Sequence, residues 1–334
     1  MNSASPYGVV AVIGAGSWGA ALARLCLDNG ARVMIWARDP DFASQIAADG
    51  ENKRYLPGVS LDGVVAARTS ADLADADAAL YVAPAQAARG LFATLASAID
   101  KPMPVAICAK GVERGTGALM PAVLSAAWPA AIPAILSGPS FAKDVAEGRP
   151  TAVTFGCRDA VSAARWAATL NRQHFRLYSS EDMVGVALGG AIKNVLAIAA
   201  GAVDGAGLGE SARAAVISRG FAEFQRLGKA MGASSETMAG LSGLGDLILT
   251  ATSPTSRNMS LGRALGEGAA AAAVLRERAS ISEGAATADA ICLLADQYDV
   301  EMPISRAVAD LVSGVRALPE IVVELLARPP RAEG

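Results

Sequence analysis

Residues 8–19 read GVVAVIGAGSWG, a run of mostly β-branched apolar residues that ends in three glycines spaced as G-x-G-x-x-G. The apolar run predicts a buried strand, and the residues from Ser17 onward predict the helix that follows it. At this spacing Gly14 permits a tight turn, Gly16 lets the backbone approach a pyrophosphate, and Gly19 allows the helix to pack closely on the strand. Because the free N–H groups at the start of the helix attract phosphates, this order of elements predicts a dinucleotide site.

Short apolar runs continue to alternate with alanine-rich helical stretches up to about residue 180. Further strands are predicted at Arg32–Trp36, Leu80–Val82, Val105–Cys108, Ile135–Leu136, Thr151–Phe155 and Phe175–Tyr178. Beyond them the strand signals end, and helices are predicted over residues 181–204, 212–227, 281–297 and 304–317, the first of them capped by Ser179 or Ser180. We therefore expect an α/β fold with a Rossmann-type, doubly wound, mainly parallel sheet in residues 1–180 and an all-helical domain in residues 181–334.

Composition excludes several classes of protein. With 52% hydrophobic and 18% charged residues, the chain is not a disordered polypeptide. A net charge of −3 gives no overall basic field, so we expect no nucleic-acid partner. Four scattered cysteines and a single histidine provide no zinc-site spacing, and they favour a reducing cytoplasm. The charge-free stretch over residues 117–142 contains four prolines, so we predict no membrane span there.

The residue that follows the second predicted strand bears on the choice of cofactor. A site for NAD prefers a carboxylate there, about twenty residues beyond the glycines, to accept a hydrogen bond from the ribose 2′-hydroxyl. This chain has Arg38, which favours a 2′-phosphate, and Asp39 comes directly after it. NADP(H) is therefore the expected cofactor, with NAD(H) still allowed; the less favoured alternative for Arg38 is a solvated loop charge.

One predicted helix carries Gly185, Gly189 and Lys193 at intervals of four residues, so the three share a face. Each glycine costs a helix about 1 kcal/mol relative to alanine, which indicates close approach by a ligand or by another backbone. A lysine in such apolar surroundings loses proton affinity and becomes suited to proton transfer. The alternative is a lysine whose ammonium reaches water from a buried helix.

Three further motifs carry polar groups in positions where a ligand could bind. Lys110 and Gly111 end an apolar strand, where ligands gather in open α/β sheets, although an ordinary turn fits them as well. Asp246 follows the flexible turn LSGLG, and Thr250 comes shortly after it. Residues 256–258 are Ser-Arg-Asn, which can hold a phosphate or merely cap a helix.

In this order, the motifs resemble the bacterial NAD(P)-dependent sn-glycerol-3-phosphate dehydrogenases over about residues 8–320. The resemblance rests on Gly14–Gly19, Asn52–Pro57 (NKRYLP), Lys110-Gly111, Ser137–Ala142 (SGPSFA), Gly189–Asn194 (GGAIKN), Ser218–Gly220, Gly243–Leu247 (GLGDL), Ser256–Asn258 and Glu283-Gly284. It implies reversible reduction of dihydroxyacetone phosphate to sn-glycerol 3-phosphate, a precursor of phospholipids. It also implies a helical domain like that of 6-phosphogluconate dehydrogenases, a cytoplasmic location and a homodimer.

The resemblance assigns a role to individual residues. Lys193 would be the general acid/base, and Lys110 and Asp246 would bind the substrate and organise that lysine. Other substrate contacts would be Gly138, Ser140, Ser256, Arg257 and Asn258. Cofactor contacts would be Gly14, Gly16, Ser17, Trp18, Gly19, Arg38, Lys110, Ala142, Arg257, Ile281 and Glu283. No metal is implied.

A few positions depart from the family pattern. Ala187 stands where glutamate is common, Ser211 replaces a common asparagine, Ala251 a frequent cysteine, and Asp144 a frequent glutamate. None of these residues is among those given a chemical role, and Ala187 and Ser211 bear at most on rate or on packing near the nicotinamide.

Two other functions compete with this reading. A 3-hydroxyacid or 6-phosphogluconate-type dehydrogenase shares the architecture and a similar Lys-Asn region, but GLGDL and Ser-Arg-Asn favour the glycerol phosphate. A dinucleotide sensor without catalysis would have no evident need to keep Lys110, Lys193, Asp246 and Arg257 together.

Overall fold

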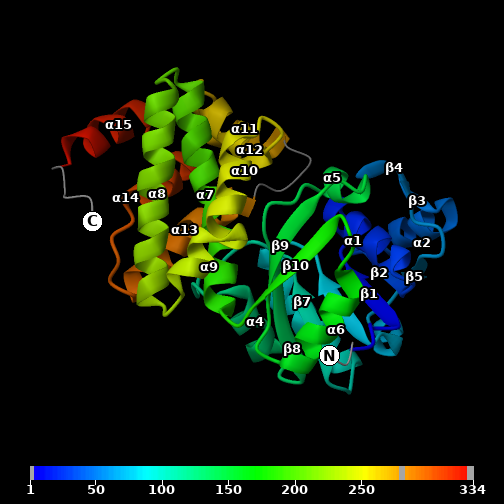
Figure 1. Cartoon of the computed structure of the whole chain (residues 1–334). Helices are drawn as coiled ribbons and strands as arrows, with labels where there is room; N and C mark the ends of the chain where they lie inside the picture. Colours follow the sequence, from blue (N-terminus) through cyan, green and yellow to red (C-terminus); the bar gives the residue numbers. More distant parts are fainter. Residues whose placement is uncertain (1–3, 278–282, 329–334) are drawn as a thin grey trace.

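The computed structural model describes residues 4–277 and 283–328, and it has a sheet-containing part and a helical part side by side (Figure 1). The large sheet consists of β1 (Val9–Ile13), β2 (Arg32–Trp36), β5 (Val65–Ala67), β6 (Ala78–Tyr81), β7 (Met103–Ile107), β8 (Ala131–Ser137), β9 (Thr151–Gly156) and β10 (Phe175–Ser180). Its strand order is β10-β9-β8-β7-β6-β1-β2-β5. All neighbours pair in parallel except β8 and β9, which are antiparallel. The expected mainly parallel α/β sheet is confirmed.

Helices cover both faces of this sheet. They are α1 (Ser17–Asp28), α2 (Pro40–Asp49), α3 (Ala88–Ala98), α4 (Met120–Ala127), α5 (Ala142–Ala146) and α6 (Ala160–Leu170), with 3-10 turns at Ala71–Asp75 and Ala85–Ala87. Because side chains alternate along a strand, Val10 and Val12 pack with α1, α2 and α6, whereas Ala11 and Ile13 pack with α3 and α4. Both sides of β1 are therefore buried, which explains its continuous apolar run.

The helical part is arranged around one long helix. Its elements are α7 (Met183–Gly205), α8 (Glu210–Ala230), α9 (Ser235–Ala239), a π-helical turn (Leu241–Gly245), α10 (Asp246–Thr252), α11 (Arg257–Gly266), α12 (Ala271–Glu277), α13 (Glu283–Gln297), α14 (Pro303–Ser313) and α15 (Leu318–Ala327). Of the described helices, α7 alone is long and apolar enough to cross a membrane, and 94% of that stretch is buried inside the protein. It is the core helix of this part, and α8, α10, α11, α13 and α14 pack against it, whereas α15 lies at the periphery (Figure 1).

Some local expectations were wrong. Neither Ser179 nor Ser180 caps α7: both belong to β10, and Asp182 caps the helix by accepting a hydrogen bond from the Gly185 N–H. A small antiparallel hairpin, β3 (Glu51–Asn52) and β4 (Leu56–Ser60), lies within the NKRYLP region, where no strand was predicted.

The strand order explains where a site can form. β1 and β6 are neighbours, but the chain continues from β1 to β2 on one side and from β6 to β7 on the other, and the glycine loop stands at the point where the two connections diverge. Arg38, Lys110 and Gly138 follow the neighbouring strands β2, β7 and β8. The sheet thus brings these residues to one edge, where ligands of open α/β sheets bind.

Candidate active site

The glycine loop leaves an open cradle above β1. Gly14 has φ +122°, a conformation that side chains rarely adopt, and a Cβ on Gly19 would lie 2.0 Å from the Gly14 carbonyl oxygen. At Gly16, in contrast, an added Cβ would meet nothing within 4 Å. No side chain caps α1 at Gly16, so the N–H groups of its first turn are free to face an anion.

Two further features near the cradle fit a dinucleotide. The buried Trp18 Nε1 has no hydrogen-bond partner within the described residues. Arg38 is exposed beyond β2, while Asp39 caps α2 by accepting from the Asp41 N–H at 3.1 Å. Arg38 and the second oxygen of the Asp39 carboxylate are therefore both exposed at the end of β2.

Lys193, Asp246 and Lys110 meet in one cluster, although they come from α7, α10 and the loop after β7. Lys193 Nζ lies 2.9 Å from Asp246 Oδ1, and Lys110 Nζ lies 2.6 Å from Asp246 Oδ2. Lys193 also donates to Thr250 Oγ1 at 2.8 Å, and Lys110 donates to the Gly138 carbonyl at 3.1 Å. One carboxylate therefore holds both ammonium groups.

Burial controls the protonation of this cluster. Burial lowers the pKa of Lys193 to about 8. The attraction of Asp246 opposes this shift, and the repulsion of Lys110 adds to it. For Asp246, burial would raise the pKa, but the two lysines outweigh it and the pKa stays below its usual value. The cluster therefore combines an ionised carboxylate with a lysine that can release its proton near neutral pH.

Glycines on α7 allow the elements of the cluster to approach. A Cβ on Gly189 would lie 2.6 Å from the Ser242 carbonyl oxygen, in the π-helical turn that leads into Asp246. A Cβ on Gly190 would lie 2.7 Å from Ser137 Oγ. Gly189 thus faces another backbone rather than a ligand, whereas Gly185 lies against the carboxylate of Asp182.

A second group of polar residues lies at the start of α11. Ser256 caps this helix by accepting from the Met259 N–H, and Arg257 is exposed in its first turn. Asn258 Nδ2 donates to Asn194 Oδ1 at 2.8 Å, and Asn194 Nδ2 donates to the Lys110 carbonyl at 3.2 Å. This chain of amides joins α11 to the lysine cluster.

The remaining predicted residues surround these two groups. Ser140 Oγ donates to the Gly138 carbonyl at 3.1 Å, and Ala142 begins α5. Glu283 begins α13; burial raises its pKa, against the attraction of Arg257, Lys110 and Lys193. Ile281 lies outside the described residues.

Two residues of the site had been noted in the sequence without a role. Thr250 lies four residues after Asp246, hence on the same face of α10, and its hydroxyl contacts Lys193. Asn194 adjoins Lys193, and an amide inside an apolar helix was a signal that a polar partner must be near.

The chain was compared with known families and proteins. Residues 9–163 match the family description "NAD-dependent glycerol-3-phosphate dehydrogenase N-terminus", and residues 182–323 match the corresponding C-terminus. The chain belongs to this family. A relative from Rhodospirillum rubrum, named glycerol-3-phosphate dehydrogenase [NAD(P)+], is 52% identical over 97% of this chain and 94% of its own length. Its counterpart from Parvibaculum lavamentivorans is 50% identical over 98% of each chain.

Solved structures agree with this assignment. The crystal structure of glycerol-3-phosphate dehydrogenase from Coxiella burnetii has a TM-score of 0.91 and 36% sequence identity, and the match covers 96% of this chain and 99% of that one. Membership of the glycerol-3-phosphate dehydrogenase family confirms the resemblance seen in the sequence. The names of the bacterial relatives include both NAD and NADP.

Proposed function

We propose that this chain catalyses the reversible reduction of dihydroxyacetone phosphate to sn-glycerol 3-phosphate with NADP(H) or NAD(H). The observation that carries the proposal is the buried Lys110–Asp246–Lys193 cluster, placed at the carboxyl edge of a sheet whose first strand ends in an open glycine cradle. Family membership supplies the substrate class, because the named relatives act on glycerol 3-phosphate.

The cradle accounts for cofactor binding. Gly14 and Gly19 shape the loop, Gly16 leaves space for a pyrophosphate, and the first turn of α1, with Ser17 and Trp18, faces it. The bound nicotinamide supplies the hydride. Arg38 favours NADP(H), and the other expected cofactor contacts are Lys110, Ala142, Arg257, Ile281 and Glu283.

Lys193 is the proposed general acid/base. In the direction of reduction its ammonium protonates the carbonyl oxygen on which negative charge develops, and in oxidation its neutral amine takes the proton from the alcohol. Asp246 and Thr250 hold the Lys193 ammonium in place. Lys110 adds a second positive charge in a site with little water, where such charges stabilise a developing alkoxide strongly.

The phosphate of the substrate is proposed to bind at the start of α11. Arg257 can bind it bidentately, and Ser256 and Asn258 add donors beside it. Gly138 and Ser140 stand on the opposite side, after β8. The chain of amides from Asn258 through Asn194 to the Lys110 carbonyl would set the distance between phosphate and carbonyl of the substrate.

Several wider expectations belong to the same proposal. The Rossmann-type domain would end at residue 180 and the helical domain begin at residue 181, between β10 and α7. The enzyme would work in the cytoplasm on a small-molecule substrate, supply the backbone of glycerophospholipids, and form a homodimer.

Turnover tests the proposal directly. Loss of NADPH or NADH absorbance is followed with dihydroxyacetone phosphate, and gain of that absorbance from NADP or NAD is followed with 3-hydroxyisobutyrate and 6-phosphogluconate as separate substrates. We expect turnover with dihydroxyacetone phosphate alone. Binding of NADPH without any oxidation would instead support a sensor, and turnover with one of the other substrates would support a different dehydrogenase.

A further inference from the structure

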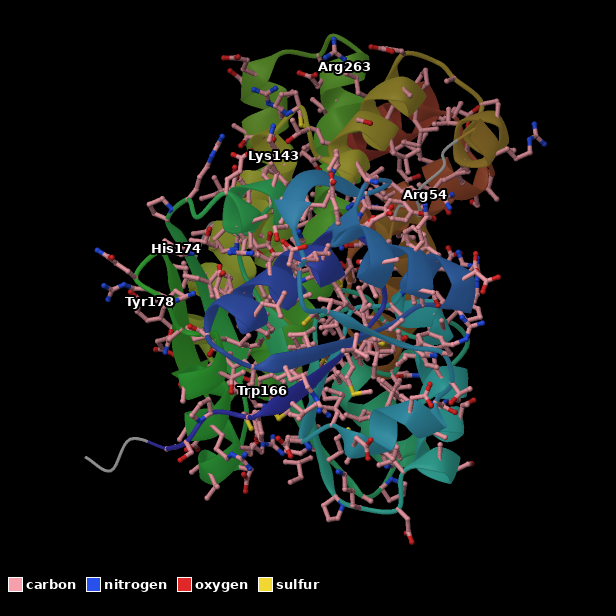
Figure 2. All side chains as sticks on the ribbon, turned by 90° about the vertical axis from the view of Figure 1, so that its right-hand side faces the viewer. Arg54, Lys143, Trp166, His174, Tyr178 and Arg263 are labelled. Atoms are coloured by element: carbon pink, nitrogen blue, oxygen red, sulfur yellow. The ribbon has the colours of Figure 1, made fainter. Side chains whose placement is uncertain are left out.

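An exposed cluster of one cation and two aromatic rings lies beside the glycine cradle. The Arg54 guanidinium is 5.1 Å from the centre of the Tyr55 ring and 5.9 Å from that of Phe42. The two rings meet edge to face at 5.8 Å. We call these three residues the Arg54 cluster; Figure 2 shows Arg54 near the upper edge of the sheet-containing part.

Hydrogen bonds and chain connections fix this cluster next to the expected cofactor. The buried Asn52 donates to the Ala15 carbonyl, within the glycine loop, at 3.0 Å, and it accepts from the Tyr55 N–H at 3.1 Å. Phe42 lies in the first turn of α2, four residues after Arg38. The cluster therefore stands between the glycine loop and the end of β2, where the adenosine ribose of a dinucleotide lies in this fold.

The cations around the expected ribose position differ in whether they form ion pairs. Lys53 lies 3.1 Å from Asp49, and Arg68 lies 3.3 Å from Asp41. Within residues 4–277 and 283–328, neither Arg38 nor Arg54 has a carboxylate within ion-pair distance. Two unneutralised guanidinium groups thus flank the ribose position, which favours an anion there.

We propose that Arg54 determines cofactor specificity by binding, together with Arg38, the 2′-phosphate of NADP. This rests on the proposed function only in that the glycine loop holds the dinucleotide. The rings of Tyr55 and Phe42 restrict the guanidinium of Arg54, so less conformational freedom is lost when the phosphate binds. A guanidinium can also donate two parallel hydrogen bonds to a phosphate, which an ammonium cannot.

The first test measures binding without turnover. Calorimetry gives the affinities of adenosine 2′,5′-bisphosphate and adenosine 5′-monophosphate for the wild type and for Arg54→Gln. We expect the ratio of the two affinities to fall about tenfold, as for the loss of one charged hydrogen-bond partner. Lys53→Gln is the matched control: it removes the neighbouring cation, which is already paired with Asp49, and should leave the ratio within about twofold.

Arg54→Lys separates charge from geometry. It keeps the positive charge but lacks the planar guanidinium, so we expect a ratio of nucleotide affinities between that of Arg54→Gln and that of the wild type. In kinetics, the ratio of kcat/KM for NADPH to that for NADH should fall in parallel with the binding ratio.

Two results would overturn the inference: an unchanged ratio in Arg54→Gln, or equal weakening of both nucleotides, which would mean a general role in adenosine binding. Absence of turnover with dihydroxyacetone phosphate in the wild type would defeat the proposed function alone, because the ratio of nucleotide affinities would still decide the role of Arg54.

Discussion

The lysine cluster and the Arg38–Arg54 rim both gather positive charge, but in opposite environments. In the lysine cluster the Asp246 side chain is 1% exposed and satisfies two ammonium groups at once. At the rim, exposed guanidinium groups have no carboxylate within ion-pair distance in the described residues. Burial strengthens each electrostatic interaction and shifts pKa values, which favours proton transfer. Exposed charges interact weakly, and at the rim they discriminate between two cofactors.

The largest effect expected from this contrast comes from Asp246→Asn. It leaves the buried Lys193 and the half-buried Lys110 without their common counter-charge, so we expect stability to fall by about 3–5 kcal/mol. With both lysines displaced, kcat should fall on the order of 10²–10³-fold. Denaturant unfolding and steady-state kinetics measure the two effects.

Asp49→Asn is the control for that change, because it breaks an exposed ion pair with Lys53. Its cost should stay below about 1 kcal/mol, without loss of kcat. Equal costs for the two variants would show that burial does not distinguish the regions.

The pH dependence of kcat reports the protonation of Lys193. Its pKa is lowered to about 8, so kcat for reduction should be level below that pH and fall about tenfold per pH unit above it. The free energy of unfolding should change in the opposite sense and rise between pH 8 and 10.5. In this range the unfolded lysine still binds its proton while the folded lysine has lost it, so the cost of burying an ammonium disappears. A flat profile of kcat from pH 7 to 10 would contradict the assigned role.

Two glycine substitutions distinguish a glycine that packs against protein from one that borders the expected pyrophosphate. Gly189→Ala places a Cβ 2.6 Å from the Ser242 carbonyl oxygen, so we expect a loss of about 1–3 kcal/mol in stability together with a lower kcat. Gly16→Ala meets no protein atom within 4 Å and should fold normally, yet raise KM for the cofactor by about tenfold because the methyl group occupies the pyrophosphate space. Thermal unfolding and cofactor titration of both variants separate the two effects. An unchanged KM in Gly16→Ala would place the pyrophosphate elsewhere.

The smallest expected effect is that of Arg38 on cofactor preference, and it should depend on salt concentration. Arg38→Ala should lower the preference for NADPH over NADH by about five- to tenfold at low ionic strength, because one charged contact is lost. At about 0.5 M salt the difference between wild type and variant should shrink, since exposed charges are screened. Kinetics with both cofactors at two salt concentrations measure this, and a preference that resists salt would argue for a buried 2′-phosphate site.

The sheet was predictable because its signals are local. Gly14, Gly16 and Gly19 sit directly after an apolar run, and that short segment alone determines strand, turn and helix. The cap of α7 was not predictable in the same way: all four side chains within residues 179–182 can accept a hydrogen bond, and pairing of β10 with β9 takes the two serines into the sheet.

The site was predictable only in part, for a related reason. Lys193 stood out as a charge in an apolar helix, but the contact with Asp246 joins residues that are 53 positions apart. The glycine spacing on α7 predicted a close approach by a ligand or a backbone, but it did not identify the π-helical turn at Leu241–Gly245 as the segment that packs against Gly189. Likewise, the β3–β4 hairpin is joined to the glycine loop by the hydrogen bond from Asn52 to the Ala15 carbonyl, a contact between residues that are 37 positions apart.

Lys193 is proposed to transfer the proton in the reduction of dihydroxyacetone phosphate. The most direct test is single-turnover oxidation of NADPH with saturating dihydroxyacetone phosphate by wild type and Lys193→Ala, with NADPH affinity measured on the same samples. We expect unchanged affinity for NADPH and a rate at least ~10²-fold lower in the variant. A Lys193→Ala rate within tenfold of wild type would contradict this role.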